Sequence, residues 1–208
     1  IRSYHYYINY GFPCQFSFGY LILPRVLRIK AGEAMGRSSK TTEFLKECMA
    51  DALIMLMNEK DFQKITADEI TATAGVGRAT WFRNFKSKED AIRYKLRTAW
   101  ERYAEKHELS ERNRFDIRNA SAFFDYNAGM QKILKTIYRA GLDMLVFDAF
   151  KEIMIEPQVN VPDRWYREKF YAYGLYGLLD GWVRRDFAET PEEMSKMTVH
   201  LVKASTVL

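Results

Sequence analysis

The sequence predicts an all-α protein with an N-terminal three-helix domain that contains a helix-turn-helix, followed by a helical C-terminal domain. Apolar residues recur at helical spacing along the chain after Met35, and helix-capping residues precede several of these stretches. No stretch alternates strictly between apolar and polar residues, as a half-buried strand would. With 208 residues, 48% of them hydrophobic and 28% charged, the chain can build one or two packed domains.

The first 34 residues differ from the rest of the chain. Between Ser3 and Pro24 there is no Lys, Arg, Asp or Glu, and aromatic residues are frequent. Glycine and proline interrupt this stretch, so a continuous membrane-spanning helix is not expected. Its basic residues follow the apolar part, whereas a signal peptide has them in front. We interpret residues 1–34 as a translated leader before a natural start at Met35; the alternative is a genuine N-terminal arm, disordered or touching membrane or DNA.

Composition argues against several classes of site. Cys14 and Cys48 are far apart, which predicts neither a disulfide framework nor a zinc site and suits a reducing cytoplasm. The histidines His5, His107 and His200 are too scattered for a metal cluster. The sequence has no phosphate-binding glycine loop, nucleophile elbow or zinc-protease signature. We therefore expect no metal, no cofactor and no catalytic residue.

We place the N-terminal domain at residues 35–90. One apolar stripe indicates its first helix. Leu45, Met49, Leu53 and Leu56 fall at positions i, i+4, i+8 and i+11, which lie on one face of a helix. The hydroxyl cluster of residues 38–42 supplies candidate caps at the start of this helix.

A helix-turn-helix is predicted at about residues 65–85. Thr66 and Glu69 have the spacing of a capping box, which opens a short second helix. The small residues of Ala74–Gly77 end this helix and turn the chain. Arg78–Phe85 then has the pattern of a short third helix.

The rest of the chain, residues 91–208, forms the C-terminal domain and is also predicted to be helical. A fourth helix begins after Ser87 and runs to about His107, and a polar connection follows at 108–118. Thr190 caps the last helix, with proline at its first position. The helices between these points are expected at about 119–128, 130–139, 142–155 and 163–186, with a loop between Pro157 and Pro162.

The predicted third helix has an anchoring face and an outward face. Val76, Trp81 and Phe85 anchor it to the core. A helix of this kind fits the major groove of DNA, where arginine, asparagine and threonine contact bases and phosphates. The outward residues are Arg78, Ala79, Thr80, Phe82, Arg83 and Asn84.

Positive charge is concentrated around this helix. Residues 77–97 contain seven basic and two acidic residues, whereas residues 108–208 contain 14 basic and 15 acidic residues. Such a distribution favours DNA binding. The alternative is a solvated basic face beside an ordinary aromatic core.

Motifs within about residues 41–95 occur in a specific order: Ile65–Ile70, then Ala74–Val76, then Thr80–Phe85, then Lys86–Asp90. This order resembles the tetracycline-repressor (TetR/AcrR) family of bacterial regulators. The pattern of that family is a Thr-capped helix, an Ala-Gly-Val-Ser turn, an aromatic-rich recognition helix and a Lys-Ser-Lys-Glu stretch.

The resemblance implies a role for each matching residue. Thr66 caps the second helix and touches a phosphate, and Lys88 holds a phosphate at the start of the fourth helix. Gly77 replaces the usual Ser and Phe82 replaces a frequent Tyr, so two hydroxyl groups are missing. Thr71 replaces a usual Ala and makes the helix packing tighter. The DNA-binding residues that the resemblance implies are Thr66, Gly77, Arg78, Thr80, Phe82, Arg83, Asn84 and Lys88.

The resemblance also implies that the C-terminal domain binds a ligand and forms a homodimer. In the 163–186 helix, three glycines lie on one face, and each costs about 1 kcal/mol of helix stability relative to alanine. Such a face indicates the close approach of another helix, from the partner subunit, which we favour, or from the same chain. We predict a dimer interface at Tyr173, Gly174, Gly177, Leu178, Gly181 and Trp182, with Tyr176 beside it.

Large apolar side chains in the middle helices are candidates for an apolar ligand pocket, although an ordinary core is the alternative. Trp100 and Tyr103 are also candidates for coupling this pocket to the DNA-binding domain. We predict a pocket lined by Trp100, Tyr103, Phe124, Met130, Tyr138, Met144 and Phe147, with Phe123, Tyr126, Phe150 and Met154 in the same helices.

These observations predict a cytoplasmic, sequence-specific DNA-binding transcription regulator without a membrane partner. Its partners are a double-stranded DNA operator, a second copy of the chain and a small hydrophobic or aromatic effector. The protein is expected to be a repressor that the effector releases from the operator. One alternative is an activator or co-activator that acts through protein contacts. Another is an all-α small-molecule-binding protein or enzyme, for which His107 and Glu108 are the only adjacent candidate groups.

Overall fold

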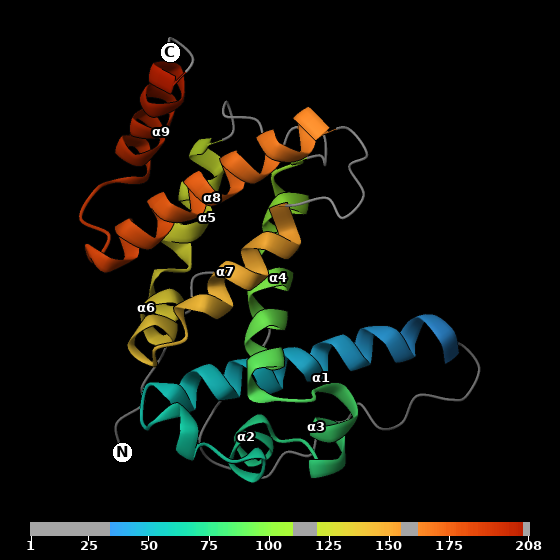
Figure 1. The fold of residues 1–208 in the computed structure, drawn as a ribbon. Helices are drawn as coiled ribbons and strands as arrows, with labels where there is room; N and C mark the ends of the chain where they lie inside the picture. The colour runs from blue at the N-terminus through green and yellow to red at the C-terminus, as the bar shows by residue number, and fades with distance from the viewer. Residues whose placement is uncertain (1–33, 110–119, 155–161, 206–208) are drawn as a thin grey trace. The chain divides into compact units, whose positions relative to one another are not determined.

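The computed structural model describes residues 34–109, 120–154 and 162–205 (Figure 1). These residues contain helices and no strand, which confirms the predicted all-α fold. The chain divides into residues 1–44 and 45–208, and apart from the first turns of α1 the features below lie in the second unit. The elements are α1 (Ala34–Met57), η2 (Phe62–Lys64), α2 (Ala67–Ala74), α3 (Arg78–Asn84), α4 (Lys88–Lys106), α5 (Ala120–Gly129), α6 (Gln131–Arg139), α7 (Asp143–Met154), α8 (Pro162–Arg184) and α9 (Pro191–Ser205).

One prediction about a helix end needs correction. The hydroxyl cluster of residues 38–42 lies inside α1, which begins at Ala34, and so it does not cap that helix. Pro162 begins α8, one residue before the start of the predicted helix, and the loop predicted between Pro157 and Pro162 lies outside the described residues. The interpretation of residues 1–34 and the connection expected at 108–118 lie largely outside the described residues. The expected domain boundary at residue 90 lies within the continuous helix α4.

Local capping defines the helix-turn-helix. The hydroxyl of Thr66 accepts from the backbone N–H of Glu69 at 3.3 Å, and the Glu69 carboxylate accepts from the backbone N–H of Thr66 at 2.9 Å, which confirms the capping box. Gly75 ends α2 with a φ of 66°, a left-handed conformation that favours glycine. Ser87 caps α4 through the backbone N–H of Asp90. The local sequence therefore sets both ends of α2 and the start of α4.

Apolar burial and two ion pairs hold α4 against the part of α1 beyond Leu45. Met49 and Leu53 are buried in the core. Lys95 of α4, itself buried, pairs with Asp51, and Arg102 pairs with Glu47. α4 begins directly after the helix-turn-helix and continues into the C-terminal domain, so one helix connects the two regions. The contacts above attach α1 to that helix.

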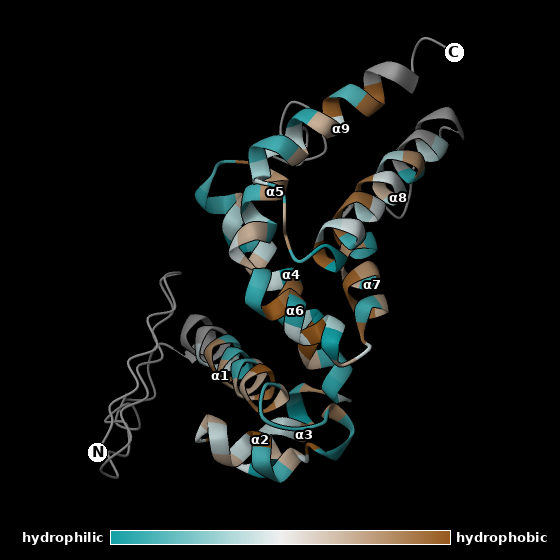
Figure 2. Cartoon of the chain, turned by 90° about the vertical axis from the view of Figure 1, so that its left-hand side faces the viewer, coloured by the Kyte–Doolittle hydropathy of each residue, from teal (hydrophilic) through white to brown (hydrophobic). Residues whose placement is uncertain are grey.

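The C-terminal helices form a second core. α5 packs against α9, as Figure 2 shows, and α7 packs against both α4 and α8. Phe124 of α5 lies at the centre, with its ring 5.5 Å from that of Trp182. Among the described residues, no helix is both long enough and apolar enough to cross a membrane.

We expect Glu69 to make stability depend on acid pH. Its hydrogen bond from Lys60, followed by those from the backbone and side chain of Thr66, lowers the pKa of Glu69 from 4.5 to about 2. Because the folded-state pKa is the lower one, this stabilisation is present above pH 4.5 and is lost as the pH falls toward 2. Glu69→Gln should be less stable than the wild type at neutral pH and lose less stability on acidification, measured by urea unfolding at several pH values.

Glu105→Gln provides the matched control, because Glu105 lies on an exposed part of α4. It should keep the wild-type pH profile. A Glu69→Gln variant with the same acid sensitivity as the wild type would contradict the role assigned to Glu69.

Candidate nucleic-acid interface

Two buried aromatic residues fix the orientation of α3. Trp81 and Phe85 are both buried, and their ring centroids are 5.2 Å apart. The Phe85 ring also meets the edge of Tyr94 from α4 at 5.7 Å. Since Trp81 and Phe85 lie four residues apart, they occupy one side of the short helix. The opposite side of α3 is thereby turned to solvent, as the sequence predicts.

The outward side of α3 carries two arginines and an exposed phenylalanine. Phe82 is 59% exposed, and the Arg78 guanidinium lies 5.5 Å from the centre of its ring. Arg78 Nε also pairs with Asp68 Oδ1 of α2 at 3.2 Å, although both side chains are well exposed. Arg83 is exposed, with no ion-pair partner among the described residues. Arg83 is therefore the cation on this surface that is most available to an anionic partner.

Three other residues of the predicted interface, Asn84, Thr80 and Thr66, are hydrogen-bonded within the protein or partly buried, and the fourth, Gly77, has no side chain to offer. Asn84 Nδ2 donates one of its two hydrogens to the Thr80 backbone oxygen at 2.7 Å, which orients the amide and leaves the other hydrogen for a base. Thr80 itself is half-buried. The Thr66 hydroxyl is exposed, but it already takes part in the capping box. Gly77 stands at the N-cap of α3 and offers no side-chain cap.

Lys88 faces into the protein, which differs from its expected role as a phosphate ligand. Its Nζ donates to the backbone oxygens of Phe62 at 2.5 Å and Ile65 at 2.9 Å, and it lies 4.4 Å from the centre of the Phe62 ring. Carbonyl groups at the end of a short helix lack intrahelical partners. The Phe62 oxygen already accepts from the Ile65 backbone N–H at 3.2 Å, so Lys88 adds a second donor there and supplies a donor to the Ile65 oxygen.

A Lys88→Met variant should test this assignment. Loss of the bonds to the η2 carbonyls should destabilise the protein by about 1–3 kcal/mol, measured by urea unfolding. The slope of log K against log salt for DNA binding should stay unchanged, because no phosphate contact is lost.

Lys86→Met is the matched comparison, since Lys86 is exposed two residues earlier. It should leave stability unchanged and reduce the salt slope by about 1 if Lys86 contacts a phosphate. A Lys88→Met protein of wild-type stability and reduced salt slope would return Lys88 to its expected role at a phosphate.

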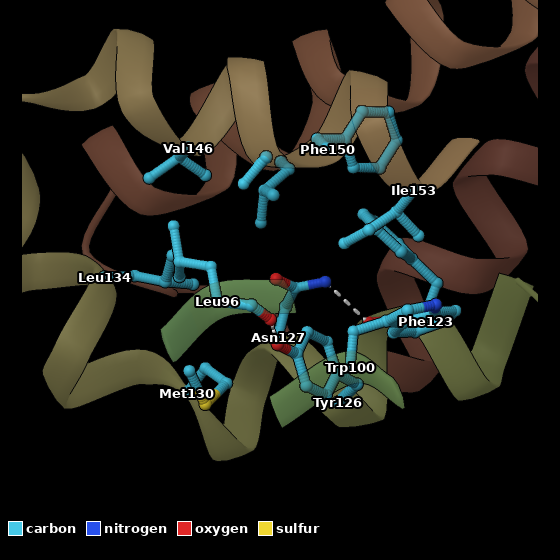
Figure 3. A pocket seen from close by; sticks show the side chains of 12 residues that line it. Leu96, Trp100, Phe123, Tyr126, Asn127, Met130, Leu134, Val146, Phe150 and Ile153 are labelled. Carbon is cyan, nitrogen blue, oxygen red and sulfur yellow. Dashed lines mark hydrogen bonds between the residues drawn. The ribbon is translucent and has the colours of Figure 1, made fainter. Parts of the chain in front are cut away.

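A small cavity lies among α4, α5, α6 and α7, with one residue from α8. Twelve residues line it, and its volume is about 40 Å³ (Figure 3). Trp100 and Met130 are the members of the predicted pocket that line this cavity. Phe123, Tyr126 and Phe150, which we also placed in these helices, line it as well.

The other residues of the predicted pocket lie elsewhere. Phe124 is fully buried in the core against Trp182, and Tyr103 stacks on His107 with ring centroids 4.1 Å apart. Tyr138 donates its hydroxyl to Asp180 Oδ1 at 3.1 Å. The remaining two lie on α7: Met144 is 58% exposed, and Phe147 packs against Tyr173 and Tyr176 of α8. Residue type identified the apolar helices but not the side of each helix that faces the cavity.

Sequence reasoning missed several lining residues, among them Leu96, Asn127 and Leu134. Each is one helical turn from a residue that we named: Leu96 precedes Trp100, Asn127 follows Phe123, and Leu134 follows Met130. Pairs at i and i+4 share a helix face. The i, i+4 spacing could therefore have identified these lining residues, but the prediction considered only large side chains.

The predicted dimer residues on α8 separate into two groups. A Cβ atom added to Gly174, Gly177 or Gly181 would meet no atom within 4 Å in this chain. Tyr173 on the same helix is exposed and Leu178 is half-buried. Trp182 is 2% exposed, and its indole N–H donates to the Glu189 backbone oxygen at 2.9 Å. Trp182 is therefore a core residue, which corrects its placement in an interface.

Two family models match separate parts of the chain. Residues 50–92 match a model of bacterial regulatory proteins of the tetR family, and residues 126–204 match a model of a transcriptional regulator C-terminal region. The first match includes α2 and α3, and the second extends from α5 to α9. Together they cover more than half of the chain. No curated protein matches the sequence.

Proposed function

We propose that this chain, which belongs to the tetR family of bacterial regulatory proteins, is a homodimeric repressor that a small apolar ligand releases from its operator. Membership in the family makes the chain a DNA-binding transcription regulator.

The outward face of α3 carries the proposal for DNA binding. Trp81 and Phe85 hold one side of this helix in the core, while Arg78, Phe82 and Arg83 remain exposed on the other. The major groove is about 12 Å wide and admits one helix. Arginine can contact guanine in a bidentate manner, and it also pairs with phosphates. We therefore place α3 in the groove, with Arg83 as its principal cation.

The exposed face of α8 supports the proposed dimer. Gly174 and Gly177 are exposed and have open space at the position of a side chain. On the same helix Tyr166, Phe170 and Tyr173 are exposed, and large exposed apolar residues often mark an interaction surface. A dimer would present two α3 helices to successive major grooves, about 34 Å apart.

Contacts of α6 on two sides support release by a ligand. Met130, which caps α6, and Leu134 line the cavity. On another side of α6, Thr136 Oγ1 and Arg139 Nη2 donate to Asn58 Oδ1, at 2.7 and 3.1 Å. Asn58 directly follows α1 and leads into η2 and the helix-turn-helix. A ligand that favours another position of α6 would therefore shift the position of the DNA-binding domain and weaken DNA binding. The coupling free energy between two such sites is typically about 1–3 kcal/mol.

A gel-shift titration of the full chain tests the proposal. The probe is DNA that flanks its own reading frame, with an unrelated duplex as competitor at fixed salt, because phosphate contacts make affinity depend on salt. We expect saturable binding that survives the competitor, and a promoter reporter whose output rises when the protein is removed. Equal weak binding to both duplexes would contradict the proposed operator, and a reporter whose output falls would make the protein an activator.

A further inference from the structure

We infer that the cavity among α4, α5, α6 and α7 binds a neutral, aromatic small molecule that carries a hydroxyl group. The inference names the ligand class of the proposed repressor and so rests on that proposed function. It follows from the charge, the unused hydrogen-bonding groups, the aromatic lining and the volume of the cavity.

The cavity excludes charged ligands. None of the twelve lining residues is an Asp, Glu, Lys, Arg or His, and Figure 3 shows mostly apolar side chains around the space. A carboxylate or ammonium group that entered it would lose its hydration without gaining a counter-charge, at a cost of several kcal/mol. The ligand that fits this wall is therefore uncharged.

Asn127 supplies an acceptor to the cavity. Its side chain is 3% exposed, and Nδ2 donates to the Phe123 backbone oxygen at 2.8 Å, the dashed line in Figure 3. This bond fixes the amide so that Oδ1 remains as an acceptor, and no described residue donates to it. The other polar side chain in the wall, Tyr126, already donates its hydroxyl to the Leu96 backbone oxygen at 3.1 Å. Oδ1 of Asn127 is thus the acceptor that a ligand would meet.

Trp100 supplies a donor in the same wall. Its side chain is 4% exposed, and the indole Nε1 is buried without a hydrogen-bond acceptor. A buried donor without an acceptor costs about 1–3 kcal/mol, which a ligand acceptor would recover. A hydroxyl group both donates and accepts. It can therefore donate to Asn127 Oδ1 or accept from Trp100 Nε1, whereas a ketone or an ether can only accept.

The aromatic lining favours a ring. Phe123 meets Phe150 edge-on with centroids 5.6 Å apart, and Trp100 meets Tyr126 edge-on at 5.1 Å. Edge-to-face arrangements of this kind are favourable for aromatic groups, so a ligand ring would extend an existing cluster.

The volume of the cavity links binding to movement. It is about 40 Å³, whereas a cavity known to hold benzene is about 150 Å³. A phenol-sized ligand must therefore displace part of the wall, and the flexible side chain of Met130 can adapt most readily. Met130 and Leu134 belong to the α6 region whose Thr136 and Arg139 hold Asn58. Entry of a ligand would accordingly press on the helix that contacts the end of α1.

Four probes of similar size test the ligand class on the full-length protein by isothermal titration calorimetry: phenol, toluene, anisole and benzoate. We expect saturable binding of phenol, with toluene and anisole about 2–10-fold weaker because toluene can make neither hydrogen bond and anisole cannot donate to Asn127. Benzoate should not bind. Toluene or anisole binding as tightly as phenol, benzoate binding more tightly than phenol, or no binding by any probe up to its solubility would overturn the inference.

Two variants assign the preference to the cavity. Asn127→Leu should bind phenol and anisole equally, because it removes the acceptor while keeping a similar volume, so that both ligands can only accept from Trp100. Ala149→Leu, at a lining position, should bind none of the probes because the added side chain occupies the space. Met144→Leu, on the exposed side of α7, should match the wild type. Thermal unfolding of each variant verifies the fold, and the probe series on the wild type decides the inference even if a variant fails to fold.

The gel shift is read separately from the calorimetry. Phenol that binds with the expected preference but leaves operator binding unchanged would support the ligand class and contradict release through this cavity. Operator binding by a protein that binds no probe would support the DNA-binding part of the proposed function and overturn the ligand class.

Discussion

Replacing Arg83 with glutamate is expected to weaken operator binding by more than about 100-fold. Arg83 is exposed on the outward face of α3, with no ion-pair partner among the described residues. One arginine contact with a base is worth about 1–3 kcal/mol. The carboxylate adds repulsion from nearby phosphates, so the total loss exceeds about 2.7 kcal/mol. The measurement is a gel-shift titration at fixed salt.

The matched control is Lys132→Glu. Lys132 is exposed on α6 and its replacement changes the net charge of the chain by the same amount. Operator affinity should fall little in this variant, and both variants should keep the helical circular dichroism and thermal unfolding of the wild type. If the two variants lose affinity equally, overall charge and not α3 governs binding, and the assignment of Arg83 fails.

The second large effect is expected at Trp182. Its side chain packs against Phe124 with centroids 5.5 Å apart and against Phe187 at 4.7 Å, and its N–H is bonded to Glu189. Truncation of a buried aromatic residue leaves a cavity and typically costs about 3–5 kcal/mol. Trp182→Ala should therefore lower the free energy of unfolding by about this amount, measured by urea titration at several protein concentrations.

Gly177→Arg separates this role from dimer formation. Gly177 is exposed, and a side chain there would meet no atom within 4 Å in the chain. The variant should fold with unchanged or slightly raised helix stability, yet sediment as a monomer where the wild type is a dimer. A Trp182→Ala protein that kept wild-type stability but became monomeric would restore the original interface prediction for Trp182.

Periodicity and capping made the fold predictable from the sequence. Apolar residues at i, i+4 and i+8 indicated α1, and the Thr66–Glu69 capping box together with Gly75 located both ends of α2. These signals are local, because they depend on hydrogen bonds and backbone angles within a few residues. The same locality explains why Trp81 and Phe85 were correctly assigned to the buried side of α3.

The side chains that join distant elements were not predictable in this way. Lys88 donates to backbone carbonyls more than 20 residues away in the sequence. Met144, predicted to line the pocket, is exposed, and Trp182, predicted to lie in the dimer interface, is buried. In each case a helix of known position is rotated by its packing against other helices, and residue type does not specify that rotation.

Propensity, capping and 3.6-residue periodicity act within single helices, so the all-α class, the helix-turn-helix and its outward residues could be predicted from the sequence. Helix packing was needed to find which residues form the cavity, that Lys88 caps η2 and that α6 joins the cavity to Asn58. Those features depend on the angles at which helices cross, which arise from side-chain packing between segments far apart in the chain.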